Sequence, residues 1–145
     1  MRRYSRAAEK GHPDAMNNLG WCYNSGEGVG VDKVKAYEWY LKAAEKGQVE
    51  AMYNLGRCYR NGEVVPVDKE KAFDWYSKAA ENGQVDAIHR LACCYDFGEG
   101  VVVDKQKAFS WYFKGATSGH VDSMNYLACC YDSGDGVSRR HSSGI

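Results

Sequence analysis

The chain has 145 residues, which is enough for one domain and too few for two ordinary enzymatic domains. Its formal net charge is +0, so it lacks the surplus of Lys and Arg with which proteins bind nucleic acid or anionic membranes. With 44% hydrophobic and 13% aromatic residues it can bury a core, which excludes extensive disorder. No run approaches the ~20 apolar residues of a membrane helix, and no signal-peptide pattern follows the N-terminal arginines. We therefore expect a cytoplasmic protein, unless truncation has removed a signal.

An internal repeat explains why a chain of this length contains 16 glycines. Gly11 and Gly47 lie 36 residues apart, and the interval continues along the chain. Four columns of identical residues keep it: Gly11, Gly47, Gly83 and Gly119; Gly26, Gly62, Gly98 and Gly134; Leu19, Leu55, Leu91 and Leu127; Tyr23, Tyr59, Tyr95 and Tyr131. A fixed period of this size is typical of a solenoid, in which each unit buries its apolar face against its neighbours.

The repeats divide the chain into one domain and a short tail. We expect a single solenoid domain over residues 1–137, followed by a disordered tail over 138–145 that does not follow the pattern. The domain consists of a partial repeat at 1–10, repeats at 11–46, 47–82 and 83–118, and a partial repeat at 119–137. Because the partial repeats leave both ends without a full polar cap, we expect either a segment of a longer protein or open ends that self-associate.

Residues 13–24 predict the first helix of a repeat, because their apolar residues recur at spacings of three and four. Pro13 and Asp14 fall in its first turn, where a proline is tolerated and negative charge suits the helix dipole. Gly26 follows as a helix stop. Within these helices, Gly20 and Gly56 predict a close approach of another element.

A second helix is predicted from the N-cap residue Asp32 to the stop at Gly47. Its apolar stripe contains alanine pairs that allow close helix packing, together with large rings that fill the remaining space. We expect one ring of each repeat, from Trp39, Trp75 and Trp111, to lie in the core.

The repeat resembles the Sel1-like repeat (SLR), a tetratricopeptide-related helix-turn-helix unit. The resemblance rests on the run Ala-Met-Tyr-Asn-Leu-Gly-Arg-Cys-Tyr at 51–59, on Gly62, and on the run 68–83 that includes Trp-Tyr-Ser-Lys-Ala-Ala. It covers essentially residues 1–137. It implies an all-α fold, a right-handed α-α superhelix with the first helices on its concave side. It also implies an interaction scaffold or adaptor without enzymatic activity.

One cysteine of each repeat falls on the apolar side of the first helix. These cysteines are Cys22, Cys58, Cys94 and Cys130. Stacked helices lie roughly 8–10 Å apart, farther than a disulfide tolerates, so we expect buried thiols. Cysteine-rich secreted relatives carry two cysteines in each repeat to bridge its helices, and this chain departs from that pattern, which favours a reducing compartment.

Two further cysteines suggest an alternative function. Cys93 and Cys129 precede the core column by one residue, which turns them toward solvent and predicts partial exposure. His89 lies four residues before Cys93, so the three residues suggest a metal- or redox-responsive module. Two ligands on one helix make a weak site, and we predict no metal and no cofactor. The chain also lacks the Gly-x-Ser-x-Gly and Ser-x-x-Lys motifs of hydrolases.

The arc of the first helices opposite the core columns varies from repeat to repeat. In tetratricopeptide-like units the corresponding positions face the groove and contact ligands. We therefore predict a peptide or protein partner in the groove, at the variable arc: Asn17, Asn18, Trp21, Tyr53, Asn54, Arg57, Arg60, His89, Arg90, Asp96, Asn125, Tyr126 and Asp132. Trp21 either contacts the partner or packs on the loop between the helices.

The arginines of the variable arc indicate what the partner carries. Arg57, Arg60 and Arg90 predict the binding of a carboxylate, from an acidic residue or from a peptide C-terminus. Asp96 and Asp132 make the far end of the groove negative. The alternative is that these are ordinary solvated residues, with Arg57 paired to a neighbouring acid.

Overall fold

A computed structural model describes residues 2–133, which form eight α-helices and no strand. The expected helix stop at Gly134 and the expected tail over 138–145 lie outside the described residues. The helices are α1 (Arg2–Glu9), α2 (Pro13–Ser25), α3 (Lys33–Glu45), α4 (Val49–Asn61), α5 (Lys69–Glu81), α6 (Val85–Phe97), α7 (Lys105–Thr117) and α8 (Val121–Ser133). In this part of the chain, no helix combines the length and the apolar character that crossing a membrane requires.

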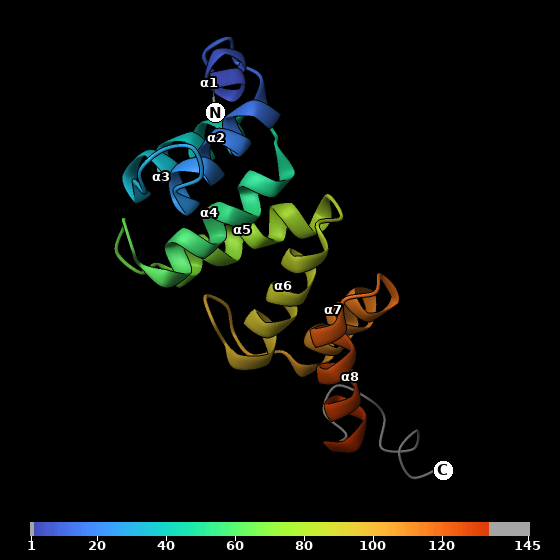
Figure 1. Ribbon diagram of the computed structural model, residues 1–145. Helices are drawn as coiled ribbons and strands as arrows, with labels where there is room; N and C mark the ends of the chain where they lie inside the picture. Colours follow the sequence, from blue (N-terminus) through green and yellow to red (C-terminus); the bar gives the residue numbers. More distant parts are fainter. Residues whose placement is uncertain (1, 134–145) are drawn as a thin grey trace.

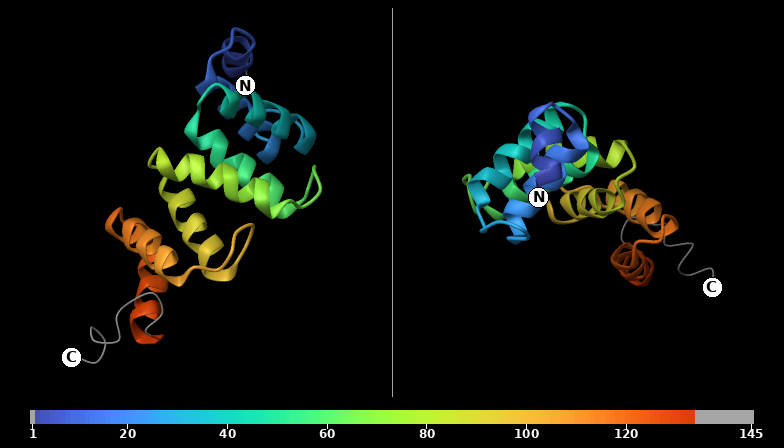
Figure 2. Two further views of the ribbon diagram at one scale, coloured as in Figure 1. Left: turned by 180° about the vertical axis from the view of Figure 1, so that it is seen from behind. Right: turned by 45° about the horizontal axis from the view of Figure 1, so that its top comes forward.

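Each helix packs mainly on the next one along the chain. The even-numbered helices α2, α4, α6 and α8 are the first helices of the repeats, and α3, α5 and α7 are the second helices. Figures 1 and 2 show the result as an elongated stack with α1 at one end and α8 at the other. The predicted all-α solenoid is therefore confirmed.

Local signals set the helix ends where the sequence predicts them. Asp32 is the N-cap of α3, and its Oδ1 accepts a hydrogen bond of 3.1 Å from the Lys35 backbone N–H. Gly26 closes α2 in the left-handed region at φ 81°, which suits a residue without Cβ. The equivalent residues Asp68, Asp104, Gly62 and Gly98 repeat both arrangements.

A ladder of polar contacts joins the start of each first helix to the next. Gln48 caps α4 by accepting from the Ala51 N–H, and its Nε2 donates to Asp14 Oδ1 at 3.3 Å. Gln84 caps α6 in the same way and donates to Glu50. The first-turn acids thus favour their own helix dipoles and also align neighbouring repeats.

The core repeats with the sequence. Leu19, Leu55 and Leu91 are at most 2% exposed, and paired alanines of the second helices, such as Ala43 and Ala44, belong to the same buried core. A Cβ on Gly56 would come within 2.6 Å of the Tyr76 ring, so the glycine allows the predicted close approach. The tyrosine ring, rather than the neighbouring tryptophan, fills the centre of each repeat.

The tryptophans of the second helices lie at the edge of the core, not inside it as predicted. Trp39, Trp75 and Trp111 are each half-buried and pack against the core with one face. A lysine lies over each ring, as in the first of these pairs, where Lys42 Nζ is 4.7 Å from the Trp39 ring centroid. The reason is rotational, because one residue turns a helix by about 100° and Tyr40 already points to the centre.

Candidate functional site

The variable arc contains contacts between neighbouring repeats. Asn54 Nδ2 donates to Asn17 Oδ1 at 3.1 Å, which joins α4 to α2. One repeat further, Arg90 lies beside the phenol of Tyr53. In the same register again, the His89 ring lies 5.3 Å from that of Tyr126, between centroids. Part of the variation between repeats therefore serves the packing of adjacent first helices.

Exposure separates the members of the variable arc. Trp21 is 48% exposed and Tyr126 38%, which are high values for large rings. Asn18, Arg57, Asn125 and Asp132 are also exposed. His89 is only 7% exposed, and the other members are partly buried. The accessible part of the arc is therefore smaller than the predicted set.

The predicted charged residues have different surroundings. Arg60 Nε lies 3.7 Å from Glu99 Oε1, on the loop after α6. Arg90 is half-buried beside tyrosine side chains. Arg57 is exposed and, among residues 2–133, forms no salt bridge; its Cζ lies 5.8 Å from the Tyr53 ring centroid. The three arginines therefore do not form one equivalent set.

Asp96 forms polar contacts with residues of its own repeat. Lys105 Nζ lies 2.6 Å from Asp96 Oδ1 and 3.2 Å from its backbone oxygen. The Tyr112 hydroxyl donates to Asp96 Oδ2 at 3.0 Å, and only 12% of the Asp96 side chain is exposed. This carboxylate therefore stabilises the packing of α7 on α6.

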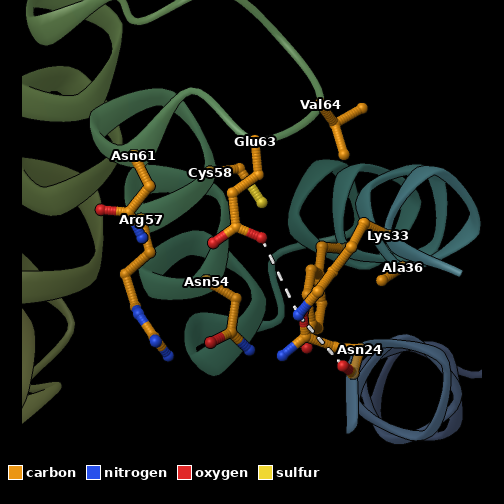
Figure 3. A pocket seen from close by; sticks show the side chains of 10 residues that line it. Asn24, Lys33, Ala36, Asn54, Arg57, Cys58, Asn61, Glu63 and Val64 are labelled. Atoms are coloured by element: carbon orange, nitrogen blue, oxygen red, sulfur yellow. Dashed lines mark hydrogen bonds and ion pairs between the residues drawn. The ribbon is translucent and has the colours of Figure 1, made fainter. Parts of the chain in front are cut away.

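A pocket of about 70 Å³ lies where α2, α3, α4 and the loop after α4 meet. Its lining combines amides and charged groups with a tyrosine: Asn24, Lys33, Ala36, Tyr40, Asn54, Arg57, Cys58, Asn61, Glu63 and Val64. Figure 3 shows Asn54 between Arg57 on one side and Lys33 and Asn24 on the other. We call Tyr40, Tyr76 and Tyr112, the buried tyrosines of the second helices, the inner tyrosines. The pocket thus lies between the variable arc and the inner tyrosine of the first repeat, Tyr40.

Hydrogen bonds and one ion pair hold the rim of this pocket. Lys33 Nζ donates to Asn24 Oδ1 at 2.8 Å and to the Asn24 backbone oxygen at 3.1 Å. The same amine lies 3.8 Å from Glu63 Oε2, in a solvent-exposed pair that contributes little stability. Sequence reasoning missed Lys33 and Tyr40 as site residues because they belong to repeating columns. The signal that could have found the pocket is the variable column that reads Asn24, Arg60 and Asp96.

The predicted exposure of Cys93 is wrong, because α7 and α8 cover this side of α6. Cys93 is 6% exposed and His89 7%, and their Sγ and Nε2 atoms are 3.5 Å apart. His89 Nδ1 lies 2.9 Å from the Ser123 hydroxyl. Burial, with the nearby His120, lowers the pKa of His89 to about 4, and burial raises the pKa of Cys93. Near neutral pH the pair is an uncharged imidazole beside a thiol, not an activated nucleophile.

The alternative of a metal module finds no set of ligands in the described part of the chain. Cys129 is exposed on α8, whereas Cys93 and His89 are buried. Across residues 2–133, no three His, Cys, Asp or Glu side chains gather as metal ligands would. His89 and Cys93 alone are two ligands short of a tetrahedral site.

The cysteine column contains free thiols where it is described. Cys22 and Cys94 are buried as predicted, whereas Cys58 is only partly buried. Burial raises the pKa of Cys58 to about 11, so its thiol is protonated near neutral pH. The side chain of Cys130, the last member of the column, lies outside the described part.

Comparison with known proteins gives consistent matches. The family model described as Sel1 repeat matches residues 13–48, 49–84, 85–120 and 121–141. Among solved structures, a protective antigen of uropathogenic Escherichia coli with an SLR fold is 37% identical over 95% of this chain, with a TM-score of 0.91. A Sel1 repeat protein from Oxalobacter formigenes is 35% identical over 93% of this chain, with a TM-score of 0.87.

A third structure is cysteine rich protein B of Helicobacter pylori, which is 28% identical over 87% of this chain and has a TM-score of 0.69. The chain spans 90% of that protein, but only 30% of the Escherichia coli antigen and 56% of the Oxalobacter protein. A search of curated proteins finds no significant match.

Proposed function

Because this chain belongs to the Sel1 repeat family, whose members are generally protein-interaction scaffolds, we propose that it binds a peptide or protein partner along α2, α4, α6 and α8. The partner occupies the concave groove that the family resemblance implies. The chain acts as an adaptor and catalyses no reaction.

The exposure of Trp21 carries this proposal. A tryptophan that is 48% exposed leaves a large apolar area in water, although the core beside it is closely packed. Rigid aromatic side chains of this kind often dominate the free energy of binding at protein interfaces. Trp21 is followed along the stack by exposed Arg57 and, on α8, by Tyr126. The variable arc thus offers both exposed apolar area and an exposed positive charge.

Two aromatic substitutions test the proposal. Peptides are selected from a random display library on the intact chain, and their affinity is measured by calorimetry. Trp21→Ala on α2 should weaken binding at least tenfold. Phe113→Ala on α7 is the matched control, because Phe113 is 49% exposed on a second helix, and it should leave affinity unchanged.

Two outcomes would contradict the proposal. One is that no peptide is selected, and the other is that Trp21→Ala and Phe113→Ala have equal effects. Light scattering at the calorimetric concentrations separates partner binding from self-association, the alternative. Circular dichroism checks that both variants keep the helical content of the parent chain.

A further inference from the structure

One position near the inner tyrosine carries a different residue type in each of the three repeats. Asn24, Arg60 and Asp96 are equivalent residues at the ends of α2, α4 and α6. In the third repeat, Asp96 places a carboxylate between Lys105 Nζ at 2.6 Å and the Tyr112 hydroxyl at 3.0 Å. A lysine and a tyrosine of the second helix therefore form a carboxylate site inside this protein.

The first repeat has the same lysine and tyrosine but no carboxylate at that position. Lys33 and Tyr40 are the equivalents of Lys105 and Tyr112, and both line the pocket of Figure 3. Asn24 offers Lys33 a neutral amide oxygen at 2.8 Å in place of a charged one. A neutral amide satisfies the hydrogen bond without adding a negative charge, so the charge of the amine is met by the exposed carboxylate of Glu63, 3.8 Å from Lys33 Nζ.

The neighbouring repeat adds a second cation. Arg57 lines the same pocket from α4, where Asn54 and Asn61 supply amide groups. Glu63 is the one acid in the lining, so with Lys33 and Arg57 the pocket carries one net positive charge. Burial, with Cys58 next, raises the pKa of Tyr40 to about 12, which keeps its hydroxyl protonated as a donor.

We propose that this pocket binds a carboxylate of the partner peptide, held by Lys33, Tyr40 and Arg57 as Asp96 is held by Lys105 and Tyr112. The proposal rests on the function proposed above and names the subsite that recognises the peptide. It moves the predicted carboxylate away from Arg60 and Arg90, whose side chains face Glu99 and Tyr53.

The probes are three short peptides that differ in where the carboxylate lies. Acetyl-Ala-Ala-Ala with a free C-terminus, its C-terminal amide, and acetyl-Ala-Asp-Ala amide are titrated into the intact chain. Binding is followed through the side-chain NH₂ signals of Asn24, Asn54 and Asn61 in NMR spectra. Either carboxylate peptide should shift these signals saturably, at least tenfold more tightly than the amide, and the tighter of the two identifies the source of the carboxylate. Equal binding of the uncharged amide would overturn the proposal.

Three variants sharpen the test. Asn24→Asp puts an internal carboxylate where the third repeat has one, and it should abolish binding of the carboxylate peptides. Tyr40→Phe removes the donor but keeps the ring, and it should weaken binding roughly tenfold. Tyr76→Phe is the matched control in the next repeat, and it should leave binding unchanged. Undiminished binding to the Asn24→Asp variant would show that the carboxylate does not sit there.

The outcomes separate this proposal from the scaffold function. If the library peptides lose affinity with Trp21→Ala but not with Asn24→Asp, the chain is a scaffold and the carboxylate site is wrong. If Trp21→Ala has no effect while the carboxylate peptides still shift the asparagine signals, the pocket stands and the extended groove does not. Melting temperatures of the variants confirm that each one remains folded.

Discussion

The inner tyrosines show how a single side chain both packs and bonds in this stack. The rings of Tyr76 and Tyr112 are at most 1% exposed. The Tyr112 hydroxyl donates to Asp96, whereas the Tyr76 hydroxyl is buried and has no hydrogen-bond partner among residues 2–133. The two tyrosines therefore pack in the same way but differ in whether the hydroxyl is hydrogen-bonded, so each serves as a control for the other.

Removal of the two hydroxyls should have opposite results. Tyr112→Phe leaves the Asp96 carboxylate without one donor and should lower the free energy of unfolding by about 1–3 kcal/mol. Tyr76→Phe removes an unsatisfied polar group and should be neutral or stabilising. Urea denaturation of both variants measures the difference. An equal loss in both would mean that the Tyr112–Asp96 hydrogen bond does not contribute.

At the scale of elements, the joint between α6 and α8 differs chemically from the equivalent contacts between α2 and α4 and between α4 and α6. His89 stacks on His120 with ring centroids 4.6 Å apart, and Ser123 replaces the alanine found at Ala51 and Ala87. Gly115 makes room, because a Cβ there would press on the Ser123 side chain. His120 Nε2 also lies 3.1 Å from Asp86 Oδ1. Several substitutions thus accompany one another at this joint.

Acid should weaken this joint. The pKa of His89 is about 4 in the folded chain and about 6.5 when unfolded, so the unfolded state binds a proton first as pH falls. The stabilisation from neutral His89 is complete above about pH 6.5 and decreases by about 2–3 kcal/mol as pH falls toward 4. His120 and Arg90 oppose the charged form, whereas Asp122 and Asp86 favour it.

Denaturation curves between pH 7 and 4 measure this effect. His89→Asn, which copies Asn17 of the first repeat, should flatten the pH dependence. Val34→Ala is the control, because Val34 is exposed and carries no titratable group, and it should leave the slope unchanged. The same slope in His89→Asn as in the parent chain would contradict the assignment.

Helix positions were predictable because their signals are local. Residues 13–24 were expected for the helix that runs over Pro13–Ser25, and Asp32 was expected at the N-cap it occupies. The burial of Cys93 was not predictable from the apolar periodicity of α6, because residues of α7 and α8 cover its side chain. The contact of Asn17 with Asn54 depends likewise on how one repeat turns against the next.

At the scale of the whole molecule, stability depends on neighbours. Each helix packs mainly on the next, and most of the buried core residues form one continuous cluster. A second, smaller cluster of Ala92, Cys93, Ala108 and Tyr112 lies within the third repeat. Because the main cluster runs through several repeats, damage in the middle of the stack should affect both sides. The variable arc, in contrast, was only partly predictable, because sequence variation reports both packing and recognition.

Leu55→Ala tests this dependence. Leu55 is 0% exposed, so the cavity should lower the free energy of unfolding by about 2–5 kcal/mol, enough to unfold a short stack. Calorimetric unfolding measures both the midpoint and the cooperativity. Leu127→Ala on α8 is the control, because Leu127 is only partly buried and its loss should cost less. An unchanged, fully cooperative transition in Leu55→Ala would contradict the assigned core.

Because each helix packs mainly on the next, the fold does not fix the length of the stack. A unit of 36 residues can be added or removed without redesign of the remaining repeats, provided that its two junctions match. The residue at the position of Asn24, Arg60 and Asp96 then decides, in each repeat, whether the lysine and tyrosine of the second helix already hold an internal carboxylate. Because the pocket takes its lining from two adjacent repeats, duplication of the first two repeats together would lengthen the molecule and would also add a second copy of the pocket, at a fixed spacing from the first.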